Sequence, residues 1–131
     1  MAAATSPIFI DTPIAGIAQI ATANTARDGT GTLGTIYTAG ADGGRVEWVR
    51  VQAIVTTTVG VVRLYVQKAG AGTNFLIKEL LITAITPSTT VEAASIEYVP
   101  SEPILLGAGD IVKASTHNAE TFTVAVFGGD Y

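Results

Sequence analysis

The stretch RVEWVRVQAIVTTTVGVVRLYV, residues 45 to 66, decides the fold class of this chain. In its first half, apolar Val49 and Val51 flank polar Arg50, and the second half alternates in the same way around Arg63. A period of two is typical of antiparallel strands with one buried face. We therefore expect two strands, joined as a hairpin at the threonine-rich segment between them.

Composition limits the protein classes that need to be considered. The chain has 131 residues, enough for one domain with its own core. Only 14% of its residues are charged, against roughly a quarter in typical soluble domains. We therefore expect a subunit whose surface contacts other subunits. A net charge of -4, with scattered basic residues, argues against a nucleic-acid partner, and the lack of cysteine excludes disulfides and thiolate chemistry.

Residues 1–32 differ from the rest of the chain and are predicted to form an extended N-terminal arm. Small residues, two prolines and a Gly/Thr-rich end make up most of this segment, but it also carries several isoleucines and Phe9. Such a segment has little core of its own, so it docks on a neighbouring subunit or wraps its own sandwich. The apolar run is interrupted by Pro7, Asp11 and Pro13, and no basic region precedes it, so we expect neither a signal peptide nor a membrane span.

Residues 33–131 are predicted to form an all-β domain, an antiparallel eight-stranded β-sandwich of the jelly-roll type, with an immunoglobulin-like sandwich as the next alternative. The run around Leu76 and Leu80 also fits helical spacing, but its β-branched residues and its Gly and Pro flanks favour a strand with a bulge near Lys78. The expected strands are residues 33–39, 45–58, 61–68, 75–85, 91–99, 104–106, 111–116 and 121–127.

Residues that often carry chemistry are few and isolated. His117 is the single histidine, and a Ser115, His117 and Asp110 triad would have to come from one strand and its turn. Carboxylate pairs for glycoside hydrolysis are not excluded by sequence. The loops beginning at Asp28 and Asp42 lack the oxygen ladder of a calcium loop, and the glycine pairs lack a phosphate-binding context, so both are interpreted as turns. We expect no enzyme activity, no cofactor and no metal site.

Two aromatic residues stand out in the 45–66 stretch. Trp48 and Tyr65 alternate with the buried valines and leucines, as Arg50 and Arg63 do, so they belong to the second face of the predicted hairpin. An aromatic group on that face is a sugar platform, an interface anchor or a group covered by the arm. We expect a subunit contact or the arm to lie there.

The segments GTIYTAG, GRVEWVRVQA, GVVRLYVQKAGAGTNFLIKELLI and PILLGAGDIVKAST, with the end TFTVAVFGGDY, resemble small jelly-roll structural proteins of tailed bacteriophages. These include capsid decoration (cement) proteins and head-spike base proteins. The resemblance covers about residues 33 to 131 and includes no catalytic motif.

This resemblance implies a virion protein on the outer capsid surface that contacts the major capsid protein as a homo-oligomer, with a trimer favoured over a pentamer. A head-spike base, a vertex protein or a carbohydrate- or receptor-binding sandwich is the alternative. Neither nucleic acid nor membrane is expected as a partner. The residues predicted to form the interfaces are Ile8, Phe9, Ile10, Ile14, Ile17, Trp48, Arg50, Arg63 and Tyr65.

Overall fold

The computed structural model describes residues 9–131, and in them the chain is all-β. Every strand expected from the sequence has a counterpart, and one strand near the N-terminus is additional. The nine strands are β1 (Thr12–Ile20), β2 (Gly34–Thr38), β3 (Gly44–Ala53), β4 (Gly60–Gln67), β5 (Asn74–Ile82), β6 (Ser95–Tyr98), β7 (Ile104–Leu106), β8 (Ile111–Thr116) and β9 (Phe122–Asp130).

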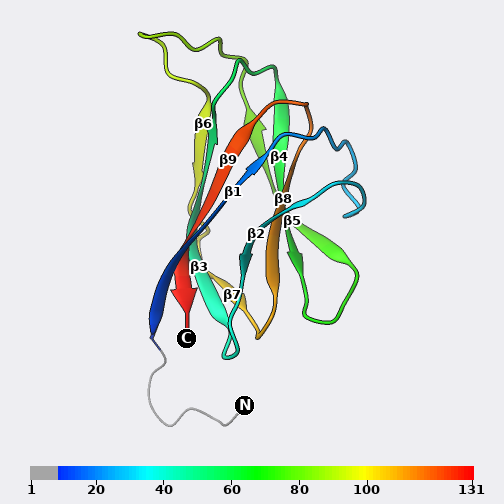
Figure 1. The fold of residues 1–131 in the computed structure, drawn as a ribbon, viewed down its shortest axis with the longest axis vertical. Coiled ribbons are helices and arrows are strands. Elements are labelled where there is room, and N and C mark those ends of the chain that lie inside the picture. Colours follow the sequence, from blue (N-terminus) through cyan, green and yellow to red (C-terminus); the bar gives the residue numbers. More distant parts are fainter. Residues whose placement is uncertain (1–8) are drawn as a thin grey trace.

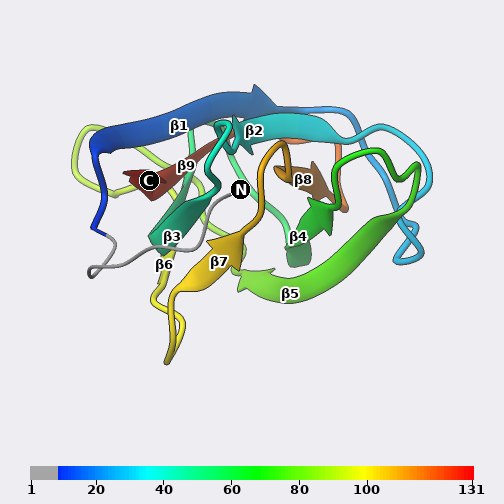
Figure 2. The ribbon, with the colours of Figure 1, turned by 90° about the horizontal axis from the view of Figure 1, so that it is seen from below.

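The strands form two antiparallel sheets that pack face to face as a β-sandwich (Figure 1). The five-stranded sheet has the order β1-β9-β3-β6, with β7 also paired to β3, and the four-stranded sheet has the order β2-β8-β4-β5. Seen from below, β1 and β2 lie together at one side of the sandwich, whereas β5, β6 and β7 lie at the other (Figure 2). The core between the sheets contains the alternating apolar residues of both.

The predicted hairpin of residues 45–66 is wrong, because β3 and β4 belong to different sheets. The six residues between them, 54–59, cross from one sheet to the other; the Ile54 amide donates to the Thr121 carbonyl and the Thr57 amide to the Ile85 carbonyl. Both strands still bury one face, since Val49 and Leu64 are fully buried in the shared core. Alternation therefore identified the strands and their buried faces, but it does not specify which strand pairs with which.

The segment predicted as an arm contains the additional strand. β1 pairs along its whole length with β9, from Thr12 opposite Asp130 to Ile20 opposite Phe122. Ile20 is buried in the core and Ile14 packs against it. Of the two alternatives considered for this segment, residues 12–20 follow the one in which the chain wraps its own sandwich.

Glycine makes the contact between β1 and β2 possible. A Cβ atom at Gly16 would lie 2.5 Å from the carbonyl oxygen of Ile36 and 2.8 Å from the Cβ of Tyr37. Both distances are shorter than any real carbon contact, so only glycine allows the two strands to approach this closely. At this edge, the five-stranded sheet therefore contacts the four-stranded sheet directly through β1 and β2.

The run of residues 74–82 is a strand, as predicted over the helical alternative. Its register against β4 shifts between Leu64 and Tyr65, which pair with Lys78 and Leu76 and leave Ile77 as the extra residue. The predicted bulge is therefore present, one residue before Lys78, and it explains the broken alternation in this run.

Candidate functional site

The outer face of the four-stranded sheet is covered by the protein itself. Residues 21–33, here called the strap, leave β1 and pass over this sheet before β2 begins (Figure 1). The strap is anchored by main-chain contacts, since the Asn24 amide donates to the Thr116 carbonyl. The Asn24 side chain closes the strap on itself, with its Nδ2 donating to the carbonyls of Thr30 and Thr32 at 2.9 and 3.0 Å.

Buried side chains of β4 reach up to the strap. Arg63 is 1% exposed and Tyr65 is 0% exposed. The Arg63 Nη1 donates to the Asn24 carbonyl at 3.0 Å, and the Tyr65 hydroxyl donates to the Ala26 carbonyl at 3.0 Å. The predicted interface residues Arg63 and Tyr65 therefore form contacts inside the chain. For these two residues, the alternative of burial under the N-terminal segment describes the structure.

A charge network completes this covered face. Arg63 Nε donates to Glu79 Oε2 at 3.0 Å, and Arg27 of the strap donates to the same carboxylate at 2.9 Å. The hydrogen bond from Arg27 lowers the pKa of Glu79, and the two positive charges act in the same direction. Arg63 also lies 3.1 Å from Nδ1 of His117. Because a guanidinium can only donate, Nδ1 of His117 accepts the hydrogen bond from Arg63. The imidazole is thus part of the contacts that hold Arg63 in place.

The other chemical candidates do not form a reactive cluster. Asp110 lies at the opposite end of β8 from His117, where Lys68 holds its pKa below the usual range. Asp28 accepts from the Thr30 amide and hydroxyl in a turn, and these bonds lower its pKa. Among the described residues, no group of three or more His, Cys, Asp or Glu side chains is placed to hold a metal ion.

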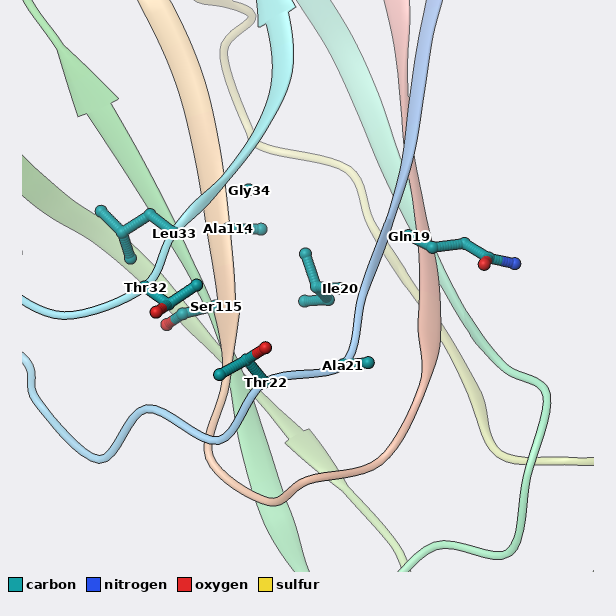
Figure 3. A pocket seen from close by; sticks show the side chains of 9 residues that line it. All are labelled: Gln19, Ile20, Ala21, Thr22, Thr32, Leu33, Gly34, Ala114 and Ser115. Atoms are coloured by element: carbon teal, nitrogen blue, oxygen red, sulfur yellow. The ribbon is translucent and has the colours of Figure 1, made fainter.

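A small cavity of about 110 Å³ lies where the strap begins and ends (Figure 3). Ser115 is buried beside it, and its Oγ has no hydrogen-bond partner within residues 9–131. Small-molecule sites typically measure about 300 to 1,000 Å³, whereas one water occupies about 30 Å³. The cavity is therefore of a size for water. The residues that line it are Gln19, Ile20, Ala21, Thr22, Thr32, Leu33, Gly34, Ala114 and Ser115.

The outer face of the five-stranded sheet, by contrast, is not covered by any described segment. Its centre is an aromatic pair, Trp48 of β3 and Phe127 of β9, with ring centroids 4.1 Å apart and planes at 17°. The two residues are direct cross-strand partners, so they point to the same side of the sheet. The guanidinium of Arg50 lies 5.4 Å from the centroid of the Trp48 ring. We call this surface the open face.

Apolar residues flank the aromatic pair on the open face. Ile17 on β1 is 60% exposed and pairs with Ala125 of β9, which in turn is opposite Arg50. Leu105 on β7 is 69% exposed and pairs with Arg45. The open face therefore carries apolar side chains across several strands, with the aromatic pair in the middle.

The charges on the open face pair with one another. Arg50 contacts Glu97 of β6, and Arg45 contacts Glu47 at 2.7 Å. Such exposed pairs contribute little to stability, at most about 1 kcal/mol each. Aromatic residues and arginine are enriched at the centres of protein interfaces, and the centre of the open face has this composition.

Of the nine predicted interface residues, the structure brings Ile17, Trp48 and Arg50 together on the open face. Ile14 packs against the core, Phe9 is 76% exposed before β1, and Ile10 is half-buried. Ile8 lies outside the described residues. Phe127 and Leu105 were missed, although Phe127 alternates with Phe122, Val124 and Val126 in the sequence and so belongs to the opposite face of the strand.

No protein-family model matches this chain. No curated protein matches it either. Within the described residues, no helix has the length and apolar character needed to cross a membrane.

Proposed function

We propose that this chain is a structural protein of a tailed-bacteriophage virion, which decorates the outer capsid surface and reinforces it by bridging major capsid protein subunits. The observation that carries the proposal is the open face, where Trp48, Phe127 and Arg50 form an interface-like centre on a sheet that no segment within residues 9–131 covers. The resemblance of residues 33–131 to phage decoration and head-spike base proteins supplies the kind of partner.

The order of the strands supports a jelly roll in particular. β6 and β7 both pair with β3 and are counted as one interrupted strand, which gives eight strands. The first strand then pairs with the last, the second with the seventh, the third with the sixth and the fourth with the fifth. A long hairpin rolled up on itself has this pairing order, and viral capsid domains are among the proteins that use it.

The mechanism we propose is burial of the open face against the capsid. Covering apolar surface contributes about 25 cal/mol per Å². A homo-oligomer, for which we favour a trimer, engages several capsid subunits at once and so gains avidity without new kinds of contact. The charged side chains of the open face form ion pairs with one another, so burying this face leaves none of these charges without a partner.

Decoration of purified capsids tests this proposal. Trp48→Ala removes the centre of the open face and is expected to weaken capsid binding at least about tenfold, as loss of an interface hot spot does. Val59→Ala is the matched control, because Val59 is 69% exposed but lies in the connection between β3 and β4. Binding is measured by cosedimentation of labelled protein with capsids. Undiminished decoration by both Trp48→Ala and Ile17→Asp would rule out the open face.

A carbohydrate- or receptor-binding sandwich is the alternative, and the half-buried aromatic pair on the open face is the observation that favours it. Phe127 covers one side of the Trp48 ring and Arg50 lies over the ring, so little of the ring face is left for a sugar. A glycan array separates the two: a strong signal that disappears in Trp48→Ala would favour the alternative. A pentameric native mass would favour a head-spike base or vertex protein.

A further inference from the structure

The edges of the two sheets differ in how they are protected. At one side β1 and β2 contact each other, and β1 begins with a proline at its second residue. At the other side β6 and β7 are only four and three residues long, and Pro100 and Pro103 lie between them. β5 also lies at this side, but it has nine residues and contains neither proline nor glycine. Among the described strands, β5 is therefore the long edge whose main-chain donors and acceptors on one side have no partner strand.

The side chains of β5 leave this edge open to another strand. Phe75 is 53% exposed, Ile77 is 41% exposed and Leu81 is 61% exposed. Its two charged residues have partners within the chain: Lys78 lies 5.2 Å from the ring centroid of Tyr98, and Glu79 binds Arg27 and Arg63. Natural sheets usually guard an edge with a free lysine, a proline or a bulge. Here the bulge at Ile77 interrupts only the middle of the strand, and residues 78–82 stay regular.

The chain before β1 is a suitable strand donor. The first ten residues carry no charged side chain, and Ile8, Phe9 and Ile10 form a short β-type run after Pro7. Phe9 is 76% exposed, so its own sandwich does not cover it. The Asp11 amide donates to the Asp130 carbonyl at 2.9 Å, which fixes the root of this segment at the β1 side of the sandwich.

The donor and the open edge lie at opposite sides of the molecule, because β1 and β5 end their respective sheets on opposite sides (Figure 2). We propose that the segment containing Phe9 and Ile10 of one copy adds as a short strand to the β5 edge of a second copy, with Phe9 packing near Leu81. Main-chain hydrogen bonds give affinity in this kind of strand addition, and alternate side chains give specificity. The proposal concerns contacts between copies and does not depend on capsid binding.

Such a contact is head-to-tail, since donor and acceptor are different parts of the chain. A head-to-tail contact closes into a ring when the rotation between copies allows it, and otherwise continues as an open assembly. The native mass of the protein then gives the number of copies in the ring.

Two full-length variants test the proposal. Phe9→Asp disables the donor and Leu81→Lys disables the acceptor; both side chains are exposed, so circular dichroism should show an unchanged fold. We expect the wild type to be oligomeric and each variant alone to self-associate at least about tenfold more weakly. An equimolar mixture of the two should form a 1:1 dimer, because one partner keeps its edge and the other keeps its arm. Sedimentation equilibrium measures all three.

The other possible occupants give different results. If copies associate through the open face, both variants keep the wild-type mass and Trp48→Ala dissociates them. If the segment folds onto its own β5, the wild type and both variants are monomers. Either result overturns the proposal. Should Leu81→Lys fail to fold, Ile77→Lys replaces it at the same edge. If Phe9→Asp loses capsid binding but keeps the wild-type mass, the segment contacts the capsid rather than a second copy, and the proposal is overturned.

Discussion

The two outer faces of the sandwich each carry an arginine and an aromatic residue, but these side chains differ in solvent exposure. On the four-stranded sheet, Arg63 and Tyr65 are 1% and 0% exposed beneath the strap. On the five-stranded sheet, Arg50 is exposed and Trp48 is half-buried, with no described segment above them. Both arginines have a carboxylate partner, so the partner alone does not distinguish the two faces.

What distinguishes the faces is where the remaining hydrogen bonds go. Arg63 donates to Glu79 and to the Asn24 carbonyl, and lies against His117, so the chain itself replaces the water that a guanidinium needs. Arg50 has Glu97 and the Trp48 ring, and water reaches the rest. A covered polar face therefore contributes to folding, whereas an open one remains available for another molecule.

Matched arginine variants should give the largest difference between the faces. Arg63→Met leaves Glu79 with one arginine fewer and the Asn24 carbonyl without its donor, so we expect a loss of about 3 kcal/mol in the free energy of unfolding. Arg50→Met removes an exposed ion pair and a solvent-accessible contact with the Trp48 ring, and should cost no more than about 1 kcal/mol. Urea unfolding measures both. Equal losses would contradict the contrast between the faces.

The sequence predicted the sandwich because side-chain burial along a strand repeats every two residues. This local pattern located β3, β4 and β9 and the outward direction of Trp48. Pairing is not local: the stack of Trp48 on Phe127 exists because β3 lies beside β9, and no pattern within either strand specifies that neighbour.

β1 was not predicted for a different reason. Ile14, Ile17 and Ile20 are three residues apart, and Gly16 weakens the strand pattern between them. In the structure, Gly16 allows β2 to approach β1 closely. The residue that weakens the strand pattern in the sequence is therefore required for the packing of β1. The strap was equally hidden, since its contacts with Arg63 and Tyr65 join segments 39 residues apart in sequence.

Replacing the carboxylates tests the same contrast through pH. The lowered pKa of Glu79 means that its contribution to stability is present above the ordinary pKa of glutamate, about 4.3, and is lost as the pH falls through the lowered value. Glu79→Gln should therefore destabilise the protein at pH 7, and its difference from the wild type should shrink below about pH 4. The effect should be smaller than that of Arg63→Met, since the Glu79 side chain is 30% exposed.

The control for this experiment is Glu97→Gln on the open face. Glu97 pairs with Arg50, and both side chains are about half exposed, at 52% and 50%. Solvent and salt screen such a pair, so its replacement should change the free energy of unfolding little at pH 7. Chemical unfolding at pH 7 and pH 3.5 measures both variants. A difference for Glu79→Gln that stays the same at both pH values would contradict the role given to its carboxylate.

Among the changes beneath the strap, the smallest effect should come from a single hydroxyl. Tyr65→Phe keeps the buried ring and removes the hydrogen bond to the Ala26 carbonyl, which costs about 1 kcal/mol. Because that bond anchors the strap, amide exchange should quicken at Asn24 and Ala26, whose amides are bonded within this region. Trp48→Phe, the matched aromatic change on the open face, should leave these amides as they are. Hydrogen exchange followed by NMR makes the comparison, and unchanged exchange in Tyr65→Phe would mean that the strap stays in place without Tyr65.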